Sequence, residues 1–73
     1  MHNNWTTNVN GERVDLSTYS IEVGDKYKKG GRIWTVVDTA ADIYTLRNPH
    51  EPDVILHKSG VVQQFRLISA VRF

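Results

Sequence analysis

The fold is decided by one stretch of the sequence, Arg32-Ile33-Trp34-Thr35-Val36-Val37-Asp38. β-Branched and aromatic residues dominate this stretch and favour extended backbone, so it is predicted to be the central strand of a sheet. Residues 39–42 are few enough to be a hairpin connection. Residues 43–48 then return as an antiparallel strand, with Tyr44 and Leu46 on the same face because side chains alternate along a strand.

A hairpin is also predicted near the start of the chain. Asn10-Gly11 tolerates the positive φ of a type I′ turn and joins two expected strands, residues 5–9 and 13–16. Trp5 is nearly all that the first of these strands has to bury, and a two-stranded ribbon is marginal on its own in water. The hairpin is therefore expected to be loosely attached.

Between this hairpin and the central strand, the sequence predicts a short strand and a basic loop. The strand begins at Ile21 and ends at the turn signal Gly24-Asp25. Residues 26–31 follow as a lysine-rich segment closed by two glycines, a composition typical of a loop.

The chain after residue 48 combines a loop, a strand and one helical turn. Residues 48–53 carry both prolines, which lack a backbone donor, so this segment is predicted to be a loop rather than part of a sheet. Residues 54–57 resume as a strand. Ser59 is expected to cap a single helical or 3₁₀ turn over residues 60–64, with Phe65 turned back onto the core.

These elements predict an all-β fold in one domain. Residues 66–69 form the last strand, and no segment has the ten or more residues of helical period typical of an α-helix. About five short antiparallel strands over residues 21–69 are expected to curl into a small SH3-like barrel plugged by the helical turn, with residues 1–16 attached outside. An open five-stranded meander is the alternative. The predicted core consists of large side chains at Val23, Trp34, Val36, Tyr44, Leu46, Ile55, Phe65 and Ile68.

The composition excludes several classes of protein. Hydrophobic residues make up 40% and charged residues 23% of the 73-residue chain, and the net charge is only +1, unlike a disordered tail or a uniformly basic nucleic-acid binder. The absence of cysteine excludes a disulfide framework and fits a reducing, cytoplasmic location. No apolar run approaches the ~18 residues of a membrane span, so no membrane partner is expected.

One ordered set of residues carries a family resemblance: Val23-Gly24-Asp25-Lys26-Tyr27, Gly31, Trp34-Thr35-Val36, Tyr44-Thr45-Leu46 and Phe65-Arg66-Leu67-Ile68. Over residues 21–69 this order resembles a group of short phage and prophage proteins from enteric bacteria. They share a Gly-Asp-x-Tyr opening, a glycine, short strands, and a terminal phenylalanine before an apolar pair. The resemblance implies an accessory protein of phage origin that works in a bacterial host cell, and it implies no particular chemistry.

No catalytic site and no cofactor are predicted. Ser59, His57 and Asp53 could supply a nucleophile, a base and an orienting acid, but they lie in no recognisable motif. Four residues also offer metal-ligating side chains, whose spacing matches no established metal site: His50, Glu51, Asp53 and His57. The chain is therefore predicted not to be an enzyme.

Nucleic-acid binding is one of two binding functions that the sequence leaves open. It depends on a basic cluster in which cations could contact phosphates and an aromatic ring could stack on a base. The alternative explanation is that these lysines only keep a sheet edge soluble. The cluster consists of Lys26, Tyr27, Lys28, Lys29 and Arg32.

Protein binding is the function that the sequence favours. Aromatic side chains are preferred anchors of interfaces because they bury a large area at small entropic cost. The candidates are Trp5, Tyr19, Tyr27 and Phe73. The expected partner is a host or phage protein, for example a host enzyme or defence complex that the chain inhibits. Pairing of two copies into a homodimer is a related alternative, since so small a domain gains core by association.

Overall fold

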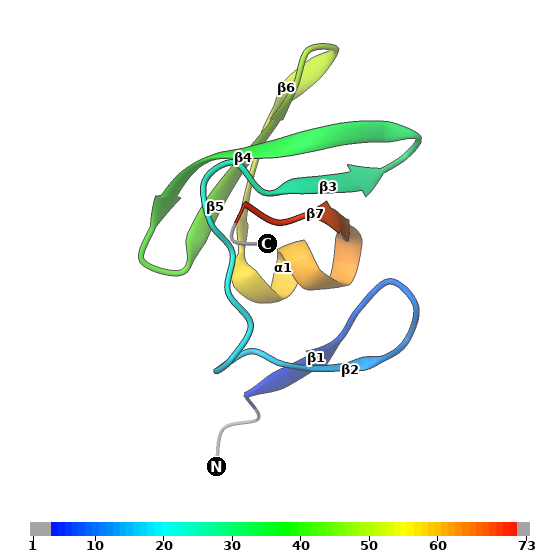
Figure 1. Ribbon diagram of the computed structural model, residues 1–73, viewed down its shortest axis with the longest axis vertical. Coiled ribbons are helices and arrows are strands. Elements are labelled where there is room, and N and C mark those ends of the chain that lie inside the picture. Colours follow the sequence, from blue (N-terminus) through cyan, green and yellow to red (C-terminus); the bar gives the residue numbers. More distant parts are fainter. Residues whose placement is uncertain (1–3, 72–73) are drawn as a thin grey trace.

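The computed structural model describes residues 4–71, which form two antiparallel sheets and one short helix (Figure 1). The fold is mostly β, as predicted. Along the chain the elements are β1 (Trp5–Thr7), β2 (Arg13–Asp15), β3 (Lys26–Lys29), β4 (Arg32–Ala40), β5 (Ile43–Asn48), β6 (Glu51–His57), α1 (Lys58–Gln64) and β7 (Arg66–Ser69).

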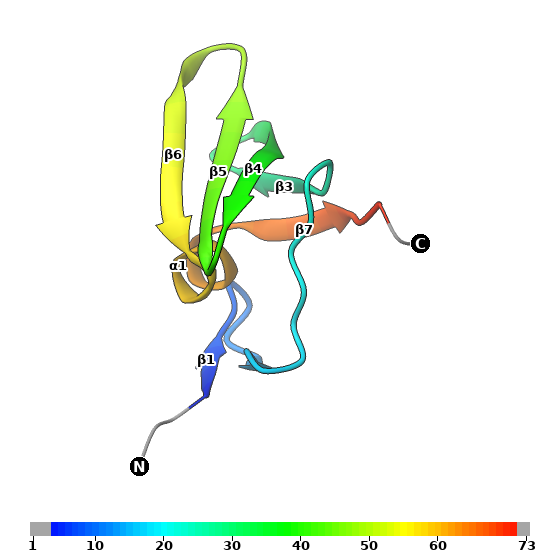
Figure 2. The ribbon, with the colours of Figure 1, turned by 90° about the vertical axis from the view of Figure 1, so that its left-hand side faces the viewer.

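The main sheet has the strand order β6-β5-β4-β3-β7, and β1 pairs with β2 in a separate hairpin. The predicted hairpin of β4 and β5 is confirmed, with Val36 opposite Leu46. Figure 2 shows the sheet strongly bent, with β4, β5 and β6 along the long axis and β3 and β7 running across it. β6 and β7 remain its two edges, so hydrogen bonds between the described strands do not close a barrel. Helix α1 lies between this sheet and the hairpin (Figure 1).

The N-terminal hairpin is confirmed, but its turn differs from the predicted type I′. Only Gly11 has positive φ, at 80°, whereas a type I′ turn needs positive φ at Asn10 as well. The Oδ1 atom of Asn8 accepts the backbone N–H groups of Asn10 at 2.9 Å and Glu12 at 3.0 Å. This side chain therefore stabilises a longer connection over residues 8–12, in the manner typical of asparagine at turns.

The predicted strand over residues 21–23 is absent. Here the chain makes a tight turn instead, in which the Asp25 N–H donates to the Glu22 carbonyl at 3.0 Å and the Glu22 N–H donates to the Asp25 carboxylate at 3.0 Å. Ile21 is buried before this turn, but Val23 lies in it and is 54% exposed. The prediction that Val23 belongs to the core is thus wrong.

The predicted basic loop is also wrong, because residues 26–29 form strand β3 between β4 and β7. Gly30 and Gly31, with φ of 60° and 74°, make the turn into β4. Because side chains alternate between the two faces of a strand, Tyr27 points to the core and is fully buried, while Lys26 and Lys28 are exposed.

The segment around the prolines is more extended than predicted. β5 ends at Asn48 and β6 begins at Glu51, so only Pro49 and His50 connect them. Pro52 lies inside β6, which is tolerated because β6 is an edge strand.

The helical turn before the last strand is confirmed, but Ser59 does not cap it. The helix begins two residues earlier than predicted, at Lys58, so Ser59 lies inside it. The Lys58 N–H donates to the Asp42 carbonyl at 3.1 Å. Val61 and Val62 are buried on one side of the helix.

The core lies on the concave side of the main sheet, under α1. The ring of Phe65 meets those of Trp34 and Tyr27 edge to face, at centroid distances of 5.6 and 6.4 Å. Ile55 and Ile68 are 64% and 43% exposed, so their predicted core positions are wrong: strand alternation turns their neighbours inward instead. The correctly predicted core residues are Trp34, Val36, Tyr44, Leu46 and Phe65; the prediction missed Ile21, Tyr27, Val61, Val62 and Ala70.

Candidate protein-binding groove and basic face

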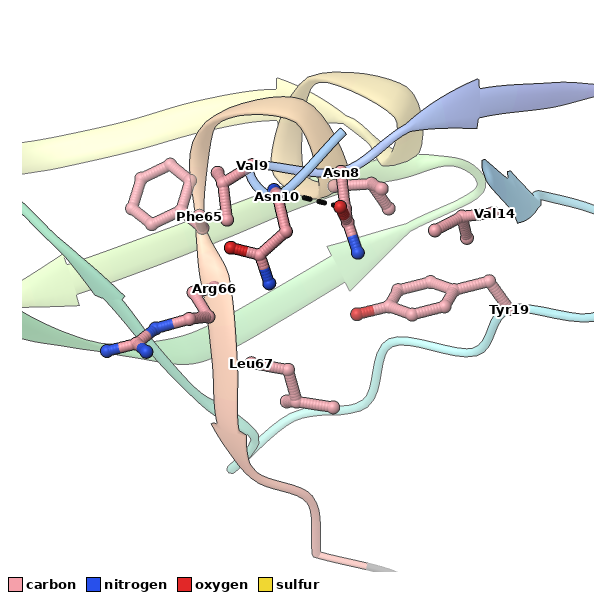
Figure 3. A pocket seen from close by; sticks show the side chains of 9 residues that line it. Asn8, Val9, Asn10, Val14, Tyr19, Phe65, Arg66 and Leu67 are labelled. Atoms are coloured by element: carbon pink, nitrogen blue, oxygen red, sulfur yellow. Dashed lines mark hydrogen bonds between the residues drawn. The ribbon is translucent and has the colours of Figure 1, made fainter. Parts of the chain in front are cut away.

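A hollow of about 210 Å³ lies between the N-terminal hairpin and β7 (Figure 3). We call it the hairpin groove. Five of its nine lining residues are apolar, and the others carry amide, hydroxyl or guanidinium groups. In Figure 3 the side chains of Asn10, Tyr19 and Leu67 point toward one another from three sides. The groove is lined by Asn8, Val9, Asn10, Val14, Tyr19, Val62, Phe65, Arg66 and Leu67.

Hydrogen bonds to helix α1 hold the hairpin and the segment that follows it in place beside the groove. The Nε2 of Gln63 donates to the Thr6 hydroxyl at 2.6 Å. The Nζ of Lys58 donates to the carbonyls of Leu16 at 3.1 Å and Tyr19 at 2.8 Å. These bonds connect residues 39 to 57 positions apart, so they fix the groove wall through tertiary structure.

Tyr19 is positioned from the core side. Its hydroxyl oxygen lies 2.9 Å from that of Tyr27, which is itself buried. A partly buried ring fixed at its hydroxyl loses little freedom on contact with a partner, which is the property that makes tyrosine an interface anchor. Of the four predicted protein-binding residues, Tyr19 is the one that the structure places in the groove.

The groove is suited to a side chain rather than to a cofactor. At about 210 Å³ it is smaller than the roughly 300 Å³ at which small-molecule pockets begin. A hollow of about 300 Å³ lies between the β3–β4 and β5–β6 turns, but its apolar lining is only Ile33 and Pro49. The hairpin groove thus has more apolar side chains in its lining, five against two.

A basic face adjoins the groove on the convex side of β3 and β7. Lys28 is directly opposite Arg66 on β7 and Ile33 on β4, so these three side chains form one row. Ile33 is 54% exposed. Arg66 also lines the groove, and its side chain points away from Tyr19 and Leu67 (Figure 3). We call Lys28 and Arg66 the cation pair.

The predicted basic cluster does not act as one unit. Tyr27 is buried and cannot stack on a base, which corrects its assignment to both proposed binding surfaces. Lys29 donates to the Gln64 Oε1 at 2.9 Å and lies 5.1 Å from the centre of the Phe65 ring, and Arg32 pairs with Glu51 at 2.9 Å. Lys26 donates to the Thr35 hydroxyl at 3.1 Å.

The remaining aromatic candidates lie outside the groove. Trp5 is 39% exposed, and the guanidinium of Arg13 stacks 4.5 Å from its ring centre. Strand alternation places both on the hairpin face opposite Thr6 and Val14, away from the groove. Phe73 lies outside the described residues.

Of the candidate catalytic residues, His57 and Ser59 line one hollow of about 170 Å³, together with Asp42, and Asp53 is not part of its lining. The Asp53 carboxylate is held by Arg47 through bonds of 3.0 and 2.9 Å, which lower the pKa of Asp53. His57 ends β6, and Ser59 lies in α1. Within residues 4–71, no three histidine, aspartate or glutamate side chains gather as they would around a metal ion.

Comparison of the chain with protein-family models, curated protein sequences and solved structures finds no match. Over the part of the chain that the structure describes, no helix has the length and apolar character needed to cross a membrane.

Proposed function

We propose that this chain is a small non-catalytic protein-binding module whose binding surface is the hairpin groove. The observation that carries the proposal is the groove itself: an apolar hollow of about 210 Å³ beside β7, an edge strand. Exposed sheet edges with neighbouring side-chain pockets are a common way to recognise extended segments of other proteins. Tyr19 and Leu67 would contact the apolar side chain of such a segment.

We further propose that the main sheet is an open form of an SH3-like barrel. Two features support this. The last strand, β7, pairs with β3, which is the first strand of this sheet along the chain, and α1 with Phe65 covers the end of the core. On the basis of the sequence resemblance to short phage proteins, we propose a host or phage protein as the partner.

Nucleic-acid binding has less support. The buried Tyr27 removes the stacking ring from the basic cluster, and Arg32 and Arg47 are neutralised by Glu51 and Asp53. Two ion-paired arginines contribute little to the attraction of phosphates, on which binding of nucleic acid depends.

The groove can be tested with random 12-residue peptides displayed on filamentous phage and selected against the immobilised chain. Nuclear magnetic resonance should then map a selected peptide onto residues 8–14 and 65–67. Val9 is 44% exposed at the groove, so Val9→Asn should weaken binding about tenfold, equivalent to ~1.4 kcal/mol of apolar contact. Val23→Asn is the matched control, since Val23 is also about half exposed and lies outside the groove. The proposal would be refuted if Val9→Asn left the affinity of the selected peptides unchanged, or if no peptide could be selected.

A further inference from the structure

We infer that the segment bound in the hairpin groove is acidic, with a carboxylate held by the cation pair next to the apolar side chain in the groove. This inference rests on the proposed function and adds the chemistry of the partner. It is carried by the position of Lys28 and Arg66 relative to each other, to the groove and to the other charges.

The cation pair is unfavourable in the isolated chain. Lys28 and Arg66 are directly opposite on antiparallel strands, where like charges destabilise a sheet. The two ion pairs among residues 4–71 use Arg32 and Arg47, and neither side chain of the cation pair makes a hydrogen bond or an ion pair within these residues. An anion between the two side chains would relieve their repulsion.

The cation pair and the groove lie on the two faces of the same edge strand, β7. Leu67 contributes to the apolar wall of the groove, and the side chain of the preceding residue, Arg66, points away from Tyr19 and Leu67 (Figure 3). A segment that runs along the edge of β7 can therefore place one side chain in the groove and the next beside the Arg66 guanidinium, which can donate two parallel hydrogen bonds to a carboxylate. An extended segment with an acidic residue directly next to an apolar one meets both requirements.

The same surface is poorly suited to nucleic acid. Among the residues that face outward with Lys28, the row contains Ile33 and Arg66 but no ring on which a base could stack. A nucleic-acid strand presents a repeating line of phosphates, and specific binders typically neutralise about 6–10 of them. Two unpaired cations fit one or two carboxylates better.

The test uses the peptides selected against the full chain, with affinities measured by fluorescence polarisation at low and at physiological salt. Selected sequences should carry aspartate or glutamate next to an apolar residue. Replacing that acid by its amide should weaken binding at least about tenfold, and so should Arg66→Glu or Lys28→Glu. Arg13→Glu makes the same change in net charge on the far face of the hairpin and should leave affinity within about twofold.

The outcomes separate the inference from the proposed function. Neutral or basic selected peptides, or acidic ones that respond to Val9→Asn but not to Arg66→Glu, would overturn the inference and leave the groove as a protein-binding site. Failure of Val9→Asn to weaken any peptide would overturn both. Two further outcomes would identify a different partner. If a 20-nucleotide DNA binds more tightly than the peptides and Lys28→Glu abolishes this binding, the partner is nucleic acid. If light scattering shows a mass that rises with concentration and Arg66→Glu abolishes the rise, the partner is a second copy of this chain. Folding of each variant is checked by its ¹⁵N–¹H spectrum.

Discussion

The carboxylate of Asp25 accepts a hydrogen bond from the backbone N–H of Val71, 46 positions further along the chain, at 2.9 Å. Its other oxygen accepts the N–H of Glu22, so one fully buried side chain joins the turn before β3 to the segment after β7. Glycine is needed beside it, because Gly24 has φ of 99° and an added Cβ would lie 2.7 Å from a Val71 methyl carbon. The Gly-Asp-x-Tyr sequence is thus a structural junction that closes the fold.

Asp25→Ala should lower the free energy of unfolding by about 2–4 kcal/mol. The substitution leaves two backbone N–H groups without their acceptor, and a buried donor left without a hydrogen bond costs about 1–3 kcal/mol. Asp38→Ala is the matched control: Asp38 is exposed on β4, so its removal should cost within about 0.5 kcal/mol. Urea unfolding at neutral pH measures both. Equal midpoints for the two variants would show that the junction contributes no stability.

The parts of the fold that the sequence predicts are those set by local pattern. The β4–β5 hairpin follows from the β-branched run in β4 and from Tyr44 and Leu46 in β5. These two residues are two positions apart, so both side chains point to the core. Tyr27 has only charged neighbours and resembles a loop residue in isolation. It is buried because β3 has a partner on each side, β4 and β7, and the second of these arrives from the far end of the chain.

The candidate site was less predictable for the same reason. Nothing near Arg66 in the sequence shows that its neighbour across the sheet is Lys28, because that pairing depends on the return of β7. The groove requires the hairpin to lie on α1 through Thr6 and Gln63, which are 57 positions apart. Tyr19 could be selected as an exposed aromatic residue, but the surface around it could not.

The two tryptophans should respond very differently to truncation. Trp34 is 4% exposed and packs on Phe65, so Trp34→Ala should cost about 3–5 kcal/mol, enough to unfold a marginally stable domain. Trp5 is 39% exposed, and Trp5→Ala should cost less than about 1.5 kcal/mol. Thermal unfolding followed by circular dichroism compares them directly. A near-wild-type melting temperature for Trp34→Ala would mean that the facing of β4 is reversed.

Asp53 should titrate below the usual range of an aspartate. The hydrogen bonds from Arg47 favour its charged form and lower its pKa below the ordinary value of 3.8. Since the folded pKa is lower than the unfolded one, the stabilisation from this pair is complete above about pH 5 and is lost as pH falls through the folded pKa. Carboxyl ¹³C shifts measured against pH give the pKa directly.

The variant Arg47→Met separates this ion pair from other causes. It should return the pKa of Asp53 towards its ordinary value. Asp15 provides an internal control, because its pKa is lowered by hydrogen bonds from the Ser17 hydroxyl and N–H, which Arg47→Met does not touch. An unchanged Asp53 titration in the variant would show that the Arg47 contact does not persist in solution.

The loose attachment of the N-terminal hairpin is a prediction that native-state hydrogen exchange can decide. Amides of β1 and β2 should exchange faster than those of β4 and β5, since the hairpin has only two strands and is tied to α1 by a few side-chain bonds. Gln63→Ala removes the bond to Thr6 and should lower hairpin protection by about five- to tenfold, equivalent to ~1 kcal/mol, without changing β4 or β5. Gln64→Ala is the control on the same helix, because Gln64 bonds Lys29 and not the hairpin. Equal protection of the hairpin and of β4 in the wild-type chain would show that the two sheets unfold as one unit, and the groove between them would then be a rigid feature of the native state.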